Sequence, residues 1–142
     1  MNNKSYSESF RGSWYSDFVS PTKNVHHFRL ELLDLCDSAA KHAEMTLIAD
    51  RGASDGRILT VLYRVHVEIC GPFIAVLAKD AKTPSDGVNT MVLELIRDDE
   101  MRGTFTWNSL TSGTIKSEAI RWTKTPSDKN RAAHKKSTEV SL

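Results

Sequence analysis

The most constraining feature of this sequence is a long run in which apolar and polar residues alternate one by one. From Leu59 to Ile69 every second residue is apolar or aromatic, and the residues between them are mostly polar. Side chains of a β-strand point to opposite faces in turn, so a period of two predicts a strand with one buried face. Residues 57–70 are therefore expected to lie in an antiparallel sheet that has one face in the core.

Segments with strand character continue through residues 10–124. The predicted strands are 10–19, 25–34, 43–49, 57–62 and 63–70 (unless 57–70 is one long strand), 73–79, 90–97, 101–107 and 114–124. Turn-forming residues separate several of them, including Gly71-Pro72 and Asp98-Asp99-Glu100. About eight sequential strands joined by short turns predict an all-β domain, either an antiparallel up-and-down eight-stranded barrel or a compact sandwich.

The segment 25–43 allows two interpretations. In a strand, Phe28, Leu30 and Leu32 share one face. In a helix, an apolar stripe forms instead from Val25, Phe28, Leu32, Leu35, Ala39 and Ala43. We favour a strand over 25–34, followed by an irregular segment or one short helix near 35–43.

The two ends of the chain show no sustained apolar period. Residues 1–9 are polar, and residues 125–142 begin at a Thr-Pro pair and carry more Lys and Arg than Asp and Glu. We therefore expect a disordered N-terminal tail over 1–9, a single barrel domain over 10–124, and a disordered basic C-terminal tail over 125–142.

Charge and hydropathy exclude several classes of protein. The formal net charge is only +1, which makes a nucleic-acid polymer an unlikely partner. The longest uncharged apolar run extends from Ile69 to Ala78, well short of the roughly 20 residues of a membrane-spanning helix. The first residues contain no apolar stretch of a cleaved signal, so we expect a cytoplasmic protein without a membrane span. Cys36 and Cys70 are then expected to be buried thiols.

No catalytic motif is found. The seven glycines are dispersed and form no phosphate-binding loop. Adjacent residues His26 and His27 point to opposite faces of a strand, and a zinc site made of His26, Cys36 and His42 would require this region to be helical. The acidic turn Asp98-Asp99-Glu100 is expected to be solvated. We predict no enzymatic activity, no cofactor and no bound metal.

Two short motifs carry a resemblance to a known family. Gly12-Ser13-Trp14 lies in the first predicted strand, and Arg121-Trp122 lies in the last. This arrangement resembles lipocalins and other calycins, in which the Trp closes the floor of the barrel and an Arg stacks across it. The resemblance implies a lipocalin-like barrel in which Trp14 contacts Arg121, an interaction with a cation–π basis.

A second resemblance covers more of the chain. The opening FRGSWYSDF and the closing MRGTFTWNSLTSGTIKSEAIRWTK are similar to small lipocalin-like barrels of bacterial anti-phage proteins. The matching features are a Gly-x-Trp-Tyr strand, the hairpin segment from Gly103 to Trp107, and the ending Trp122-Thr123-Lys124. In the two-transmembrane β-rich effectors of CBASS-type systems, such a barrel is similar to the sensor of a cyclic oligonucleotide. This chain differs from those effectors in having no transmembrane segment.

The first functional hypothesis is therefore a non-catalytic ligand-binding barrel in anti-phage signalling. Its ligand is expected to be a small planar anionic molecule, with a cyclic nucleotide as the specific candidate. The candidate ligand-binding residues are the inward aromatic residues Trp14, Tyr63, Phe105 and Trp107 and the cationic residues Arg64, Arg102 and Arg121.

The alternative hypothesis is a protein–protein interaction or assembly module with a solid barrel core. An exposed patch for a partner or for a second copy in a homo-oligomer would then contain Leu30, Leu33, Leu35, Ile96 and Trp122. The interior of the barrel distinguishes the hypotheses: a cavity with polar groups favours ligand binding, and a solid core favours the interaction module.

Overall fold

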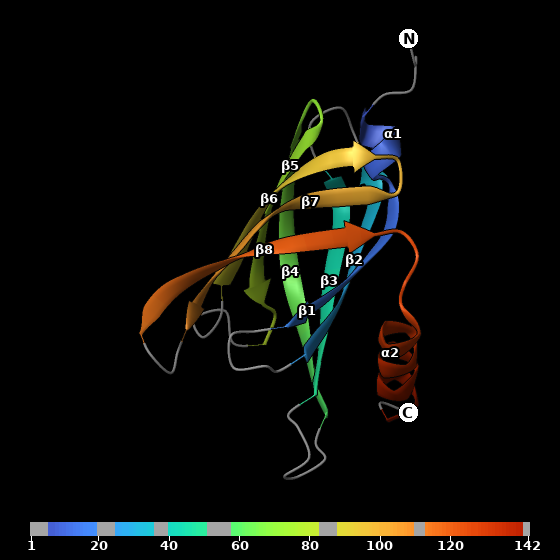
Figure 1. The fold of residues 1–142 in the computed structure, drawn as a ribbon, viewed down its shortest axis with the longest axis vertical. Coiled ribbons are helices and arrows are strands. Elements are labelled where there is room, and N and C mark those ends of the chain that lie inside the picture. The colour runs from blue at the N-terminus through green and yellow to red at the C-terminus, as the bar shows by residue number, and fades with distance from the viewer. Residues whose placement is uncertain are drawn as a thin grey trace.

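The computed structural model describes residues 6–19, 25–35, 40–50, 58–82, 88–109 and 113–140. Within these ranges the chain forms a closed antiparallel barrel in which each strand pairs with the next (Figure 1). The strands are β1 (Gly12–Val19), β2 (Val25–Leu35), β3 (Ala40–Asp50), β4 (Ile58–Cys70), β5 (Phe73–Asp80), β6 (Val88–Arg97), β7 (Glu100–Ser109) and β8 (Thr114–Thr123). Helices α1 (Tyr6–Phe10) and α2 (Asp128–Val140) flank it. The predicted up-and-down eight-stranded barrel is confirmed.

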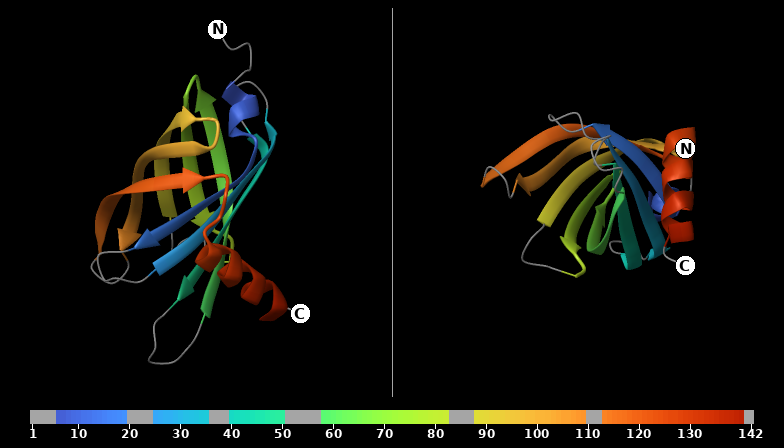
Figure 2. Two further views of the ribbon diagram at one scale, coloured as in Figure 1. Left: turned by 45° about the vertical axis from the view of Figure 1, so that its right-hand side comes forward. Right: turned by 90° about the horizontal axis from the view of Figure 1, so that it is seen from below.

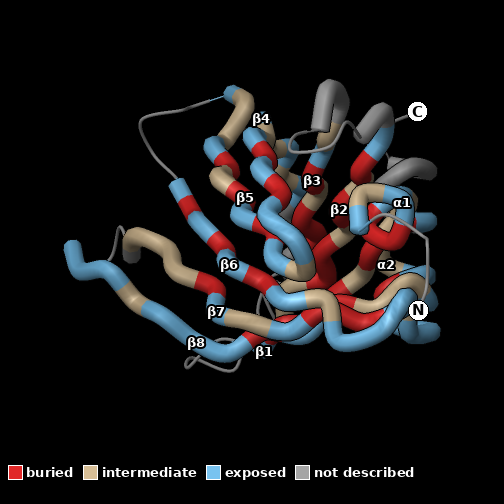
Figure 3. Tube along the Cα trace, turned by 90° about the horizontal axis from the view of Figure 1, so that it is seen from above, coloured by how far each residue is buried: buried red, intermediate tan, exposed pale blue. Residues whose placement is uncertain are grey.

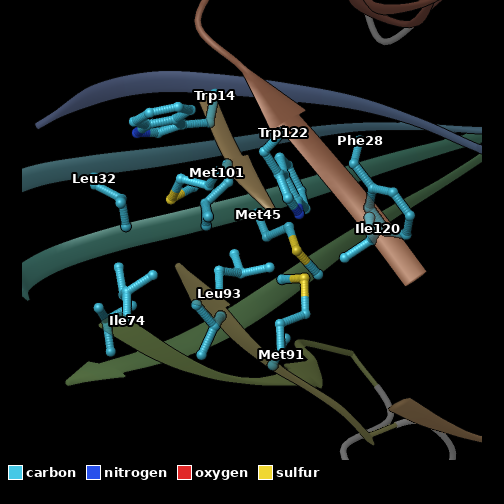
Figure 4. Packing of buried hydrophobic residues seen from close by; sticks show 14 of the residues in the cluster. Trp14, Phe28, Leu32, Met45, Ile74, Met91, Leu93, Met101, Ile120 and Trp122 are labelled. Atoms are coloured by element: carbon cyan, nitrogen blue, oxygen red, sulfur yellow. The ribbon is translucent and has the colours of Figure 1, made fainter. Parts of the chain in front are cut away.

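Alternating side chains build the core inside the barrel. Buried and exposed positions follow each other along β5 and β6 in Figure 3. In β4, which is one continuous strand rather than two, Val67 and Ile69 are buried whereas Leu62 is exposed on the outer face. Figure 4 shows Trp122, Met45 and Met91 packed together in the interior. The period of two therefore predicted correctly which face of β4 is buried.

The segment 25–35 is a strand, as favoured from its sequence. β2 pairs with β1 from Val25 to Leu32 and with β3 from His26 to Leu35. Leu35 and residues 40–43 also lie in strands, so the short helix expected near 35–43 is wrong at these positions, and residues 36–39 lie outside the described ranges. Two paired neighbours satisfy the backbone of β2, which outweighs its helical apolar stripe.

The turn between β4 and β5 follows from its glycine. Cys70 pairs with Phe73, and the two-residue loop has Gly71 at φ +57°, a backbone conformation that glycine adopts readily. Cys70 is exposed, so the expectation of a buried thiol is wrong for this residue. The alternation that buries Ile69 turns Cys70 to the outer face. Cys36 lies outside the described residues.

Both predicted tails are wrong where the structure describes them. Tyr6–Phe10 is helical, and Asp128–Val140 forms α2, which lies beside β1 and β2 in both views of Figure 2. Among the described residues no helix is long and apolar enough to cross a membrane. Residues 1–5, 141 and 142 lie outside the described ranges.

Polar contacts attach α2 to the barrel. Asn130 is fully buried, and its Nδ2 donates to the backbone oxygens of Ser16 and Phe28 at 3.3 and 3.2 Å. The carboxylate of Asp17 accepts from Asn130 Nδ2 at 3.0 Å and from Ser127 Oγ at 2.5 Å. Ser127 Oγ also accepts the backbone N–H of Asn130, which caps the start of the helix. Because α2 docks on the barrel through polar groups, its sequence has no helical period of apolar residues from which the helix could be predicted.

The barrel closes unevenly. β1 and β8 share a single pair of partners, Tyr15 and Thr123, and next to it Ser16 Oγ donates to the carbonyl of Arg121 at 2.6 Å. Every other neighbouring pair of strands forms a long ladder. A depression lined by both strands follows the remaining gap. The barrel is therefore sealed at the end near Trp14 and incompletely sealed towards the opposite end.

Candidate functional site

One end of the barrel is filled by Trp14 and covered by α1. Trp14 is fully buried, and its Nε1 donates to the carbonyl of Phe10 at 2.8 Å. Lys124 Nζ lies 5.0 Å from the centre of the Trp14 ring and donates to the carbonyl of Ser9 at 2.8 Å. Trp14 therefore belongs to a closed floor and does not line the cavity at the opposite end of the barrel.

The predicted stacking of Arg121 on Trp14 is wrong, because Lys124 takes that place. Trp122 points into the barrel, so its neighbour Arg121 points outward. Two residues further along, Lys124 reaches back over the floor. The cation on the Trp14 ring is thus the Lys of the Trp-x-Lys ending.

Arg121 and Arg102 instead bind a buried carboxylate on the outer side of the barrel. Glu100 Oε2 accepts from Arg121 Nε at 2.8 Å and from Arg102 Nε at 2.5 Å, and Arg97 lies 3.3 Å from Oε1. Hydrogen bonds from Arg121 and Arg102 lower the pKa of Glu100 to about 2. The turn at Asp98 and Asp99 is exposed as expected, but Glu100 is not solvated.

Arg64 also lies on the outer face, where it is exposed and pairs in register with Glu44. The three predicted cations therefore do not meet the inward aromatic residues. None of them is among the described residues that line the aromatic cavity at the open end of the barrel.

The cavity lies at the end of the barrel opposite Trp14 and has a volume of about 160 Å³. Its lining consists of Phe18, His26, Phe28, Leu47, Tyr63, Val88, Asn89, Phe105, Trp107 and Asn108. Many of these residues lie near the ends of their strands: β1 ends at Val19, and β6 begins at Val88. No Lys, Arg, Asp or Glu is among the described lining residues, so the site is mainly apolar with a few polar groups.

Aromatic rings in contact form one wall of this cavity. Phe105 and Trp107 are stacked, with ring centres 5.1 Å apart and an angle of 22° between their planes. Phe18 meets both rings edge-on at 5.2 and 5.5 Å, and Phe28 meets Phe105 edge-on at 5.5 Å. Such edge and stacked contacts hold each ring in place, so the wall is preorganised for a flat apolar group.

Besides His26, the side chains of Asn89, Asn108 and Tyr63 interrupt the apolar lining. Asn89 is only 5% exposed, and its Oδ1 has no hydrogen-bond partner within the described part of the chain. Asn108 Oδ1 accepts the backbone N–H of Val88 at 2.9 Å. Burial, together with the charge of Asp80, raises the pKa of Tyr63 to about 12. Tyr63 therefore remains a neutral phenol at physiological pH.

Of the predicted ligand-binding residues, the structure brings together Tyr63, Phe105 and Trp107 and leaves Trp14 and the three arginines elsewhere. From the sequence, Phe28 is placed on the face that is buried, with Leu30 and Leu32, but is not identified as a lining residue. The other lining residues not identified from the sequence are Phe18, His26, Leu47, Val88, Asn89 and Asn108. Asn89 carried a signal in the sequence, since it shares its strand face with the buried residues Met91 and Leu93. A polar residue at an inward position of a barrel strand marks a possible binding group.

Comparison with known proteins supports the fold. No protein-family model matches the sequence, and a search of curated proteins gives no match. Among solved structures, the chain is similar to a de novo designed fluorescence-activating beta barrel, with a TM-score of 0.58 and 15% sequence identity. The similarity covers 86% of this chain and 99% of the designed chain. At this identity the likeness shows a shared β-barrel fold.

Proposed function

We propose that this protein binds a small planar ligand in the aromatic cavity without catalysing its conversion. The observation that carries the proposal is the preorganised wall of Phe18, Phe105 and Trp107 beside the buried amide of Asn89. Small-molecule sites combine such apolar walls with a few polar groups that orient the ligand.

The size of the cavity limits the ligand. An engineered apolar cavity of about 150 Å³ binds benzene, and this cavity measures about 160 Å³. It therefore accommodates one ring or a small fused ring system. A larger ligand would place one such group inside and leave its remainder at the mouth.

A cyclic nucleotide that signals phage infection remains a specific form of this proposal. Its support is the sequence resemblance to anti-phage sensor barrels, which also implies a cytoplasmic site of action. One nucleobase matches the cavity, and base stacking on aromatic side chains contributes about 1–3 kcal/mol per base. The phosphates would have to remain outside, because the described lining offers no Lys or Arg.

The interaction-module hypothesis has less support. Its discriminating feature was a solid core, whereas the barrel holds a cavity with a buried polar group. In the patch suggested for a partner, Leu30 and Trp122 are fully buried, while Leu33 and Ile96 are exposed. The side chain of Leu35 lies outside the description.

The non-catalytic part of the proposal agrees with the geometry of one Ser, His and Asp cluster. Ser127 Oγ donates to Asp17, and His27 Nδ1 contacts the same carboxylate at 2.6 Å. A nucleophilic serine is activated by a base that accepts its proton, and in catalytic triads this base is the histidine. Here the Ser127 hydroxyl is bonded to the carboxylate that helps hold α2 in place.

Binding is tested by calorimetry and thermal unfolding with a panel of indole, adenine, cyclic mononucleotides and cyclic di- and trinucleotides. A ligand at 100 times its Kd should stabilise the fold by about 2.7 kcal/mol. Trp107→Leu should weaken binding, whereas Arg64→Ala, on the outer face, should leave it unchanged. If no member of the panel binds, the proposal is overturned and the interaction module becomes the better hypothesis.

A further inference from the structure

We infer that the group bound inside the cavity is an uncharged nitrogen heteroaromatic ring whose edge donates a hydrogen bond to Asn89 Oδ1. The inference rests on the proposed function and specifies the class of ligand. Indole and the free purine bases belong to this class because each presents a ring N–H at its edge, and in a nucleotide the guanine N1–H or the adenine amino group would be the donor.

The position of Asn89 supports a role in ligand recognition. It lies on the inner face of β6, directly opposite Trp107 on β7 and Ala78 on β5. Trp107 belongs to the stacked pair of the aromatic wall. A flat ligand lying against that wall would therefore turn its edge towards the Asn89 amide.

Asn89 is also unusual in its hydrogen bonding. Buried polar side chains almost always have a partner, because an unpaired group loses its contact with water without compensation. At 5% exposure, Asn89 Oδ1 has none among the described residues. A ligand donor would supply the missing hydrogen bond, so binding should be selective for molecules that carry one.

The remaining lining groups narrow the chemistry further. Asn108 Oδ1 already accepts a backbone N–H, so among the side-chain amides lining the cavity it is the Asn89 oxygen that lacks a donor. Neither Lys and Arg nor Asp and Glu occur in the described lining, so apart from His26 no side chain there would pair with an ionised group inside the cavity. An uncharged ring system with a donor at its edge therefore matches this lining best.

Two molecules of nearly equal shape test this inference. Indole presents a ring N–H, whereas benzofuran has an oxygen in the same place and can only accept. Calorimetric titration of the full chain should show that indole binds at least tenfold more tightly. A site built around a hydrogen bond discriminates strongly against an analogue that leaves its polar group unpaired.

A matched pair of variants tests whether Asn89 causes the difference. Asn89→Leu keeps a similar volume without the amide and should bring the two affinities within about twofold. Thr90→Val alters an exposed residue next to Asn89 on the same strand and should preserve the preference for indole. Circular dichroism would establish that both variants fold, and the comparison of the two ligands on the unmodified protein does not depend on them.

The outcomes separate the two proposals. Equal binding of indole and benzofuran to the unmodified protein overturns the donor inference and leaves the proposed function standing. A preference for indole that persists in Asn89→Leu also overturns it, since the selectivity would then have another origin. If indole fails while a member of the panel without a ring-edge donor binds, the inference is likewise overturned. Absence of any binding overturns both.

Discussion

Trp14 shows how much a single side chain contributes at the floor of the barrel. It is fully buried, donates to the carbonyl of Phe10 and lies under the ammonium group of Lys124. Trp14→Ala should lower the free energy of unfolding by about 3–5 kcal/mol, because it removes a large buried ring and leaves a cavity.

Urea denaturation measures this loss. Lys135→Ala, on the exposed side of α2, is the control and should change stability by less than about 0.5 kcal/mol. Equal stability of the two variants would show that Trp14 does not hold the floor together.

At the scale of single residues, alternation predicted the inward aromatic side chains but not the partners of the charges. Tyr63, Phe105 and Trp107 lie inside because parity along a strand is a local property. The role of both arginines depends on the buried Glu100: Arg102 reaches it from two residues further along β7, whereas Arg121 meets it from the neighbouring strand β8. Strand register decides that contact, and register is not visible in a local pattern.

At the scale of elements, the pairing of β6 with β7 depends on Gly103. A Cβ at this position would collide with the backbone carbonyl of Val92 on β6. Gly103→Ala should therefore lower the free energy of unfolding by about 1–3 kcal/mol, because backbone atoms must shift to make room for the Cβ. Thr104→Ala, at the next and exposed position, should have little effect. Urea unfolding midpoints of the two variants test this, and similar midpoints would contradict it.

The attachment of α2 should weaken in acid. Burial, with the charges of Arg29 and His27, lowers the pKa of His134 to about 4. Burial raises the pKa of Asp17, but hydrogen bonds from Ser127, His27 and Asn130 outweigh that effect and lower it. Both pKa values are thus lower in the folded than in the unfolded state. The contribution of His134 to the free energy of unfolding is complete when the pH is above 6.5, the ordinary pKa of histidine. It is lost as the pH falls towards about 4, the pKa of His134 in the folded protein.

Unfolding free energies measured between pH 7 and pH 4 should therefore decrease with falling pH. His134→Leu removes one titrating group, so its stability should vary less over the same interval. An unchanged pH dependence in this variant would show that His134 is not responsible.

Strands and turns were largely predictable because each depends on residues close together in the sequence, as at Gly71-Pro72. The helix α2 was not, since its docking groups Asn130 and His134 are polar and resemble those of a solvated segment. Their partners on β1 and β2 lie more than a hundred residues away. A polar interface leaves no hydrophobic period to detect.

At the scale of the whole molecule, the closed floor restricts ligand binding to the opposite end of the barrel. Trp14, α1 and Lys124 fill the floor, so a ligand cannot extend through the barrel. The cavity therefore occupies only the end that holds Trp107 and Asn89. The sequence predicted the barrel, whereas the depth of the cavity depends on which inward side chains meet across it.

The single residue pair between β1 and β8 has a consequence for amide hydrogen exchange. Along β8, alternate backbone N–H groups point towards β7 and towards the gap beside β1. From Thr114 towards Trp122, every second amide should therefore exchange quickly with deuterium, and this alternation should end at the Thr123 pair. β1 and β8 are thus joined only near Tyr15 and Thr123, and moving the two strands apart beyond this pair breaks no ladder of hydrogen bonds. A ligand that reaches Phe18 through this gap should slow the exchange of those amides while leaving the floor unchanged.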